Sequence, residues 1–129
     1  MFKYIKTIHS HTVAETTKRP VYDDIYFPMG TICQLSDGYI CQSHEAGKPN
    51  YLTIEEKKFN DGKTSLDCIR LLPGMMLMVT YTPETTPIGV GDMCCFTTDA
   101  DDFVTTIASI GKDAEVVSTD GNTAIIIVN

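Results

Sequence analysis

The stretch Gly30-Thr-Ile-Cys-Gln-Leu-Ser-Asp-Gly-Tyr-Ile-Cys-Gln42, followed by Gly47-Lys-Pro-Asn-Tyr-Leu52, decides the fold of this chain. Two short runs of strand-like composition flank Ser36-Asp37-Gly38, and Gly38 can take the positive φ that closes a three-residue hairpin loop with a bulge. The segment contains turn and strand signals and no reactive group. It therefore predicts a β-rich domain and does not indicate a chemical reaction.

The three-residue loop fixes a pairing register for this hairpin. We expect Leu35 opposite Tyr39 and Cys33 opposite Cys41, which makes one face of the hairpin apolar. The opposite face alternates glutamine with isoleucine, so it has a mixed character.

The rest of the chain repeats this pattern of short apolar runs between turns that contain glycine or proline. The run 75–81 is so hydrophobic that we expect a strand buried on both faces. Residues 55–59 suit a single helical turn, but Asn60-Asp61-Gly62 follows at once and suits a hairpin turn equally well. Residues 101–108 suit either a short helix or a strand. Further strand candidates are 21–27, 51–54, 65–72, 93–97, 114–118 and 123–128. Together these features predict one all-β or β-dominated domain, a small barrel or sandwich with at most one short helix.

Residues 1–19 show only weak periodicity. Phe2 and Tyr4 suit an opening strand, whereas residues 9–19 suit an arm or loop. We therefore divide the chain into an N-terminal arm over 1–19 and a single β-rich domain over 20–129.

Composition limits the classes of function. The chain has 129 residues and a net charge of −7, which disfavours binding to phosphate backbones or to anionic lipid surfaces. The longest apolar runs, 75–79 and 124–128, are far shorter than the roughly 20 residues that span a bilayer. The first residues lack the apolar core of a secretory signal. We expect a protein that binds neither nucleic acid nor membrane.

Five cysteines cannot all form pairs with one another. They lie mostly among apolar and β-branched residues, where cysteine behaves as a small hydrophobic residue. Without a secretory signal, a reducing compartment is expected, and the cysteines are expected to be thiols. Adjacent Cys94 and Cys95 would point to opposite faces of a strand, which argues against joint metal ligation.

Two groups of residues contain side chains that could bind a metal ion. His9 and His11 would share one face of a strand, but no third ligand follows from the spacing unless His44 joins them in space. The acids within 99–102 lack the glycine and glutamate of a calcium loop. A polar arm and a surface acidic turn are the favoured interpretations, so we expect no metal and no cofactor.

Catalysis is not indicated either. The chain lacks the serine-nucleophile, phosphate-loop and dinucleotide motifs, and the adjacent acids at 23–24 and 55–56 would point to opposite faces of a strand. The methionines within 75–78 suit either core packing, which we favour, or an adaptable binding surface. We expect a protein that is not an enzyme, without catalytic or cofactor-binding residues.

The segment 30–74 resembles a head decoration protein, or capsid cement protein, of tailed phages and prophages. The resemblance lies in Gly30 to Leu35, the turn Asp37-Gly38-Tyr39, the segment 47–52, and Leu66-Asp-Cys-Ile-Arg-Leu-Leu-Pro-Gly74. It covers about a third of the chain and consists of turn glycines and alternating strands.

The resemblance implies a small β-rich structural protein of the virion, found in the virion and in the host cytoplasm. Its partner would be the major capsid protein, whose neighbouring subunits it would clamp, often as a homotrimer. Residues 1–19 are similar in composition to the N-terminal arm of such proteins. We expect the contact surface on this N-terminal segment and on the loop 83–92, and we expect a chain without residues 1–14 to fold but not to bind.

Two other classes stay open. A small β-barrel that binds a ligand or peptide would have an apolar pocket with a few convergent polar groups. A cysteine-dependent enzyme would have one thiol of lowered pKa.

Overall fold

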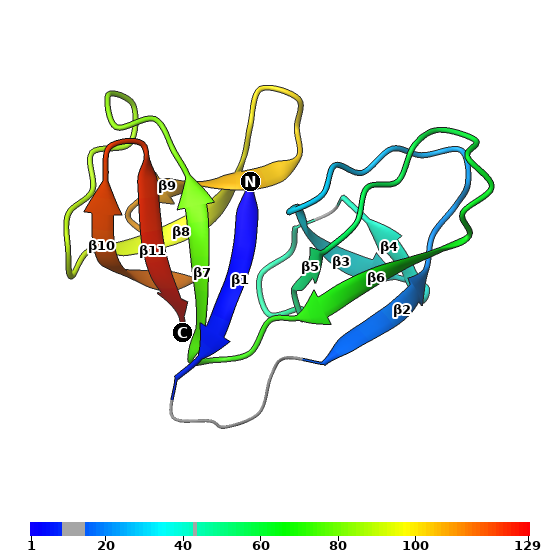
Figure 1. The fold of residues 1–129 in the computed structure, drawn as a ribbon, viewed down its shortest axis with the longest axis horizontal. Helices are drawn as coiled ribbons and strands as arrows, with labels where there is room; N and C mark the ends of the chain where they lie inside the picture. Colours follow the sequence, from blue (N-terminus) through cyan, green and yellow to red (C-terminus); the bar gives the residue numbers. More distant parts are fainter. Residues whose placement is uncertain (9–14, 43) are drawn as a thin grey trace.

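The computed structural model describes residues 1–8, 15–42 and 44–129. These residues form antiparallel strands and no helix, which confirms the predicted all-β fold (Figure 1). The sheet is not closed into a barrel and fits a sandwich-type description. Its strands are β1 (Phe2–Thr7), β2 (Thr16–Pro20), β3 (Ile32–Ser36), β4 (Tyr39–Cys41), β5 (Tyr51–Thr53), β6 (Ser65–Arg70), β7 (Met75–Thr80), β8 (Met93–Thr98), β9 (Val104–Ser109), β10 (Ala114–Asp120) and β11 (Thr123–Val128).

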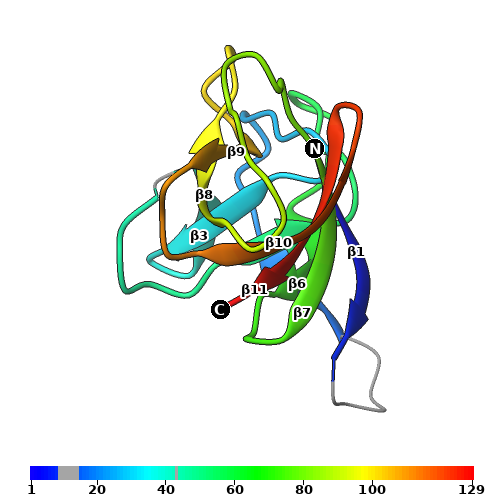
Figure 2. The ribbon, with the colours of Figure 1, turned by 90° about the vertical axis from the view of Figure 1, so that its left-hand side faces the viewer.

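The strands follow the order β1-β7-β11-β10-β8-β9-β3-β5-β6-β2, and β4 pairs with β3. The sheet curls into two lobes, one built by β1 and β7 to β11 and the other by β2 to β6 (Figure 1). Turned by 90°, the molecule shows β10 and β11 crossing in front of the second lobe (Figure 2).

The layer formed by β3, β5 and β6 separates two hydrophobic cores. Ile32, Leu52 and Ile69 point into a first core, which they share with buried side chains of β1 and β7 to β11. Cys33 and Tyr51 point to the other side, into a smaller second core. The second core consists of Val21, Phe27, Cys33, Ile40, Tyr51, Leu66 and Cys68. Because both sides of this layer are covered, all three residues of β5 are buried.

The predicted register of the β3–β4 hairpin is wrong by one residue. Ser36 pairs with Tyr39 and Leu35 with Ile40, so the turn has two residues and not three. Both turn residues have positive φ, 50° at Asp37 and 83° at Gly38. Aspartate tolerates this conformation, and a two-residue turn with two positive φ angles matches the twist of the strands.

The register places Gln34 in the interior. Its amide nitrogen donates to the Glu45 carbonyl and to the Asn50 side chain at 2.9 and 3.0 Å, and its oxygen accepts the Glu45 N–H at 2.7 Å. These bonds satisfy the buried amide and hold the 44–50 turn against β3.

The expectation that 75–81 is buried on both faces is wrong. Within β7, Met75, Leu77 and Val79 point into the first core, while Met76 is half-buried and Met78 is 36% exposed. The strand lies between β1 and β11, and its outer face meets solvent. Of the methionines in this run, only Met75 belongs to the core.

The N-terminal segment takes part in the sheet. Phe2 is buried in the first core, edge-on to Phe96 with ring centroids 5.3 Å apart. Strand β2 pairs with β6 and crosses the expected arm boundary at residue 19, where a loop was expected. The arm and domain division stays a prediction, and His9 and His11 lie outside the described residues.

The structure decides between the alternatives for the two segments whose sequence suits more than one structure. Residues 104–109 form β9, so the strand alternative for 101–108 is right, and 55–59 holds a bridge between Lys57 and Phe27 in place of a helical turn. The C-terminal hairpin of β10 and β11 is confirmed, with its turn at 121–122.

Gly30 joins β1 to the middle layer. Its N–H donates to the Thr53 carbonyl at 2.8 Å, and its carbonyl accepts the Phe2 N–H at 2.9 Å. Its φ is +77°, and a Cβ there would lie 2.6 Å from the Phe2 carbonyl oxygen. This position therefore requires glycine, for backbone conformation as well as space.

Candidate functional site

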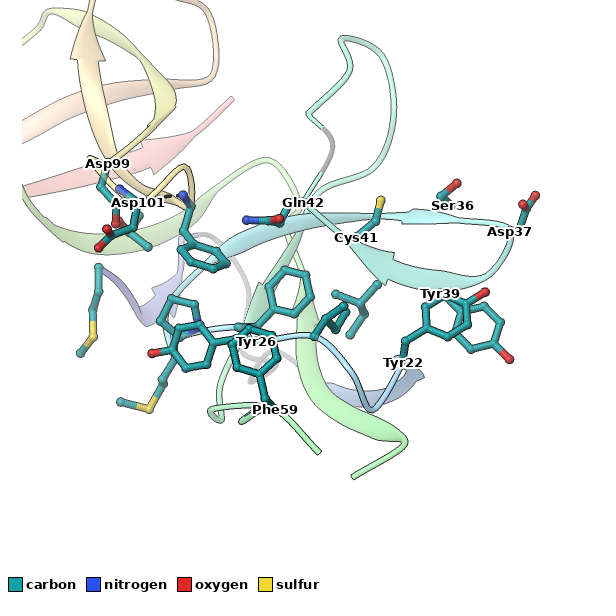
Figure 3. A pocket seen from close by; sticks show the side chains of 18 residues that line it. Tyr22, Tyr26, Ser36, Asp37, Tyr39, Cys41, Gln42, Phe59, Asp99 and Asp101 are labelled. Atoms are coloured by element: carbon teal, nitrogen blue, oxygen red, sulfur yellow. Dashed lines mark hydrogen bonds between the residues drawn. The ribbon is translucent and has the colours of Figure 1, made fainter. Parts of the chain in front are cut away.

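A groove with a volume of about 1010 Å³ opens beside the second core (Figure 3). Its walls are the loop 21–29, the β3–β4 hairpin, and the turn 99–103 between β8 and β9. Six of the chain's eleven aromatic residues line it: Tyr22, Tyr26, Phe27, Tyr39, Phe59 and Phe103. This concentration marks the groove as the candidate functional site, because exposed apolar patches commonly mark binding surfaces.

These rings pack against one another, and all of them except the buried Phe27 remain at least partly open to solvent. Tyr22 stacks on Tyr39 with centroids 4.2 Å apart and planes 9° apart. Tyr26 stacks on Phe59 at 5.9 Å and meets Phe103 edge-on at 5.6 Å. Tyr22 is nevertheless 54% exposed and Phe59 65% exposed. The groove thus presents an aromatic surface whose rings are already placed.

The loop 21–29 turns its two tyrosines outward because its two anchors, one of them aromatic, point inward. Val21 and Phe27 are buried in the second core. Phe27 also pairs with Lys57 through two backbone hydrogen bonds of 2.9 and 2.8 Å. With both anchors fixed, Tyr22 and Tyr26 line the groove.

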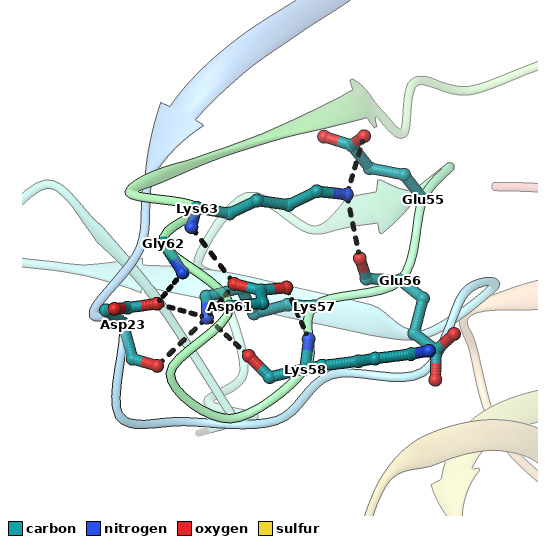
Figure 4. Close-up of polar contacts among 8 residues, drawn as sticks. All are labelled: Asp23, Glu55, Glu56, Lys57, Lys58, Asp61, Gly62 and Lys63. Atoms are coloured by element: carbon teal, nitrogen blue, oxygen red, sulfur yellow. Dashed lines mark hydrogen bonds and ion pairs between the residues drawn. The ribbon is translucent and has the colours of Figure 1, made fainter.

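Lys57 holds two of the loops together (Figure 4). Its side chain is buried, and Nζ donates to the carboxylates of Asp23 at 2.9 Å and Asp61 at 2.6 Å. Nζ also donates to the carbonyls of Asp23 and Lys58. Because Asp23 belongs to the loop 21–29 and Lys57 and Asp61 to the loop carrying Phe59, this cluster fixes the relative position of two groove segments.

The opposite charges of the Lys57 cluster stabilise one another. Burial alone would lower the pKa of Lys57, but its bonds to Asp23 and Asp61 outweigh burial and raise that pKa. The hydrogen bond from Lys57 is the main cause that holds the pKa of Asp61 well below its ordinary value, with further bonds from the Lys63 and Lys58 N–H groups. Both shifts favour the charged forms, the ammonium of Lys57 and the carboxylate of Asp61.

The acidic turn between β8 and β9 forms the third wall. The Asp99 carboxylate accepts bonds from the Thr105 hydroxyl at 2.6 Å and from the N–H groups of Asp101 at 2.8 Å and Phe103 at 3.3 Å. Burial would raise the pKa of Asp99, but these bonds, led by that of Thr105, lower it. The acids within 99–102 thus build a tight turn that places Phe103.

The cysteines do not form a recognisable nucleophilic site within the described part of the structure. Burial raises the pKa of Cys33, of Cys68, and of Cys94 to about 11, so these thiols are poor nucleophiles at neutral pH. Cys41 lines the groove and its thiol donates to the Gln34 carbonyl at 3.4 Å. No disulfide joins the five cysteines, all of which are described. Among the described residues, no three His, Cys, Asp or Glu side chains form a metal-binding group.

The loop 83–92 and the described N-terminal residues, both expected to form the contact surface, lie largely outside the groove. The loop 83–92 lies away from the groove and borders two small hollows, one with Ile110 and the other with Gly121. Among the described residues of the N-terminal segment, 1–8 and 15–19, Met1 alone borders the groove. Their role in binding stays a prediction.

Sequence reasoning did not identify the groove. The aromatic and β-branched content of 21–27 predicts a strand, and this prediction is wrong. The segment is a loop with one isolated bridge at Phe27, and its buried ends, Val21 and Phe27, enclose the tyrosines that line the groove. Phe59 and Phe103 had no signal of their own, because nothing local shows that they meet Tyr26.

Comparison of the chain with protein-family models, with curated proteins and with solved structures finds no match. In the described part of the chain, no helix has the length and apolar character needed to cross a membrane.

Proposed function

We propose that this chain is a structural protein of a phage-type virion that stabilises the capsid by binding the assembled shell, with the aromatic groove as its contact surface. The observation that carries this proposal is the groove itself, where six aromatic residues are held in place on an acidic all-β fold. The resemblance of residues 30–74 to capsid decoration proteins supports the same assignment.

The physical basis of this proposal is the thermodynamic linkage between binding of the protein and assembly of the shell. A protein that binds the assembled shell but not its separate subunits stabilises assembly by mass action. Rings that already contact one another, such as Tyr22 on Tyr39, lose little conformational freedom on binding. A groove built this way gains affinity without needing a reactive group.

Co-sedimentation tests the proposal. Purified protein would be mixed with empty expanded shells of the major capsid protein encoded in the same genome, and separately with unassembled capsid subunits. We expect saturable binding to shells and little binding to subunits. Shells that sediment without the protein, under conditions in which it is folded, would contradict the proposal.

Oligomeric state gives a second test of the resemblance. Light scattering behind a sizing column distinguishes a 14.2 kDa monomer from a closed trimer, which would be 3 × 14.2 = 42.6 kDa. A trimer would support threefold placement on a shell. A monomer would favour single-copy binding.

A ligand- or peptide-binding module is the second candidate, and the groove favours it as well. Its volume of about 1010 Å³ is at the upper end of the range typical of small-molecule sites, roughly 300–1,000 Å³. Enhanced fluorescence of a hydrophobic dye, lost on replacing Phe59, together with a failure to bind shells, would favour this candidate over the capsid role.

A further inference from the structure

The geometry points to a specific kind of occupant for the groove: an extended polypeptide segment in which lysine or arginine flanks apolar or aromatic residues. This inference rests on the proposed function, because it names the chemistry of the partner segment that the virion protein would bind.

The described residues that line the groove include acidic side chains and no basic ones. Asp37, Asp99 and Asp101 line the groove, and no lysine or arginine is among its described lining residues. The ion pairs of the described residues use other acids, and none of them involves these three. Met1 also borders the groove, and its N-terminal amino group adds to the hydrogen bonds that, against the effect of burial, lower the pKa of Asp99. Among the described lining residues, three carboxylates face this single cation, so the groove keeps a negative charge on a protein whose net charge is already −7.

The acidic side chains lie at the two ends of the groove. Asp99 and Asp101 lie at one end of the groove and Asp37 at the other, with Tyr26 and Phe59 between them (Figure 3). An extended chain laid along the groove would place apolar side chains on the rings and cationic side chains at both ends. Electron-rich aromatic faces also attract cations.

Other classes of occupant fit less well. A nucleic acid or an anionic membrane would bring phosphates against the acids and would be repelled. A metal ion lacks its ligands, because the described residues hold no group of three candidate side chains. A cationic polypeptide satisfies both the apolar rings and the carboxylates of Asp37 and Asp101, which no ion pair of the described residues uses.

Fluorescence anisotropy with three labelled peptides of about ten residues tests this inference. The first peptide has lysines at both ends and leucine and tyrosine in the middle, the second replaces the lysines by glutamates, and the third replaces the apolar residues by serines. We expect saturable binding of the first, at least about tenfold tighter than of either other peptide and weakened by salt. Equal binding of the first two peptides, or no saturable binding of the first, would overturn the inference.

Three variants locate the binding. Phe59→Ser is expected to weaken the lysine-flanked peptide about tenfold, and Asp37→Asn about threefold with a smaller salt dependence. Val90→Ser is the matched control, since Val90 is 71% exposed and does not line the groove. Equal weakening by Val90→Ser, or none by Phe59→Ser, would contradict binding in the groove.

The outcomes separate this inference from the proposed function. If shells bind the protein but the lysine-flanked peptide does not, the capsid role stands and the inference about the occupant is wrong. If the peptide binds in the groove but shells do not, the occupant chemistry stands and the capsid role is wrong.

Discussion

The two cores on either side of the β3–β5–β6 layer are closed in different ways. The first core is enclosed by strands and contains eighteen buried residues, all apolar or aromatic apart from one cysteine. The second core contains seven buried residues, two of them cysteines, and is covered by the β3–β4 hairpin, β2 and the loop 21–29. One side is closed by ladder hydrogen bonds, and the other depends on loops.

The difference shows how the fold provides a binding surface. Strands that close a core direct alternate side chains inward and satisfy their own backbone. Loops need separate polar contacts, and the second side has them in Lys57, Gln34 and Asp99, each with at least three hydrogen bonds. The loops held this way keep the aromatic rings at the surface, where strands would have buried them.

Removing a side chain from the first core should have the largest effect. Phe2→Ala is expected to lower the free energy of unfolding by about 3–5 kcal/mol, because a buried ring that packs edge-on to Phe96 is lost. Urea denaturation of the purified variant measures the change. Lys3→Ala is the control, since its exposed side chain should contribute little.

The same variant tests the expected N-terminal arm. A mobile arm predicts unchanged stability for Phe2→Ala, whereas a strand of the first core predicts the large loss. Because Phe2 is buried, we expect that a chain lacking residues 1–14 also loses stability, which a binding experiment with that chain would have to take into account.

Lys57 tests the polar support of the second side. Lys57→Ala is expected to lower the melting temperature by about 5–10 °C, because it leaves Asp23 and Asp61 without their cation and opens a space under the loops. Lys57→Met keeps most of the volume and should cost about half as much. Thermal unfolding followed by circular dichroism measures both, and an unchanged Lys57→Ala would show that the cluster does not hold the loops.

Acid should weaken the second side selectively. The pKa of Asp61 is lower in the folded protein than in the unfolded chain, so its contribution is complete above the ordinary carboxyl pKa and is lost as pH falls below it. The melting temperatures of wild type and Asp61→Asn should therefore differ most at neutral pH and converge towards about pH 2. A difference that stays constant with pH would contradict the ion pair.

The aromatic stack should have the smallest effect on stability. Tyr22→Ala is expected to lower the free energy of unfolding by about 0.5–1.5 kcal/mol, because the ring is half-exposed and its main contact is Tyr39. A double-mutant cycle with Tyr39→Ala measures the coupling between the two rings. A loss as large as that of Phe2→Ala would mean that the groove rings belong to a core.

The features that could be predicted from the sequence are those that neighbouring residues determine, such as strands and turns. Alternation and turn glycines identified the strands around Gly30–Gln42 and the C-terminal hairpin. The hairpin register failed at one residue, because Asp37 accepts a positive φ that was assigned to Gly38 alone. The exposure of one face of β7 depends on its neighbours in the sheet, which its own apolar run does not reveal.

The groove could not be predicted because its parts are far apart in the chain. Tyr26, Phe59 and Phe103 meet only after the sheet has curled, and no spacing rule links them. No local pattern predicts that Lys57 is buried, because its burial depends on the separate positions of Asp23 and Asp61. Sequence patterns report local structure, whereas this site is a product of tertiary contacts.

Shell binding by Phe59→Ser, compared with wild type and Leu72→Ser, tests the central claim most directly. Leu72 is the control because it is 47% exposed and lies outside the groove, the N-terminal segment and the loop 83–92. Phe59 is 65% exposed, so its replacement should leave the fold intact while removing a central ring of the groove. We predict that wild type and Leu72→Ser co-sediment equally with assembled shells and that Phe59→Ser binds about tenfold more weakly. Equal binding of all three proteins would contradict the claim that the aromatic groove is the contact surface.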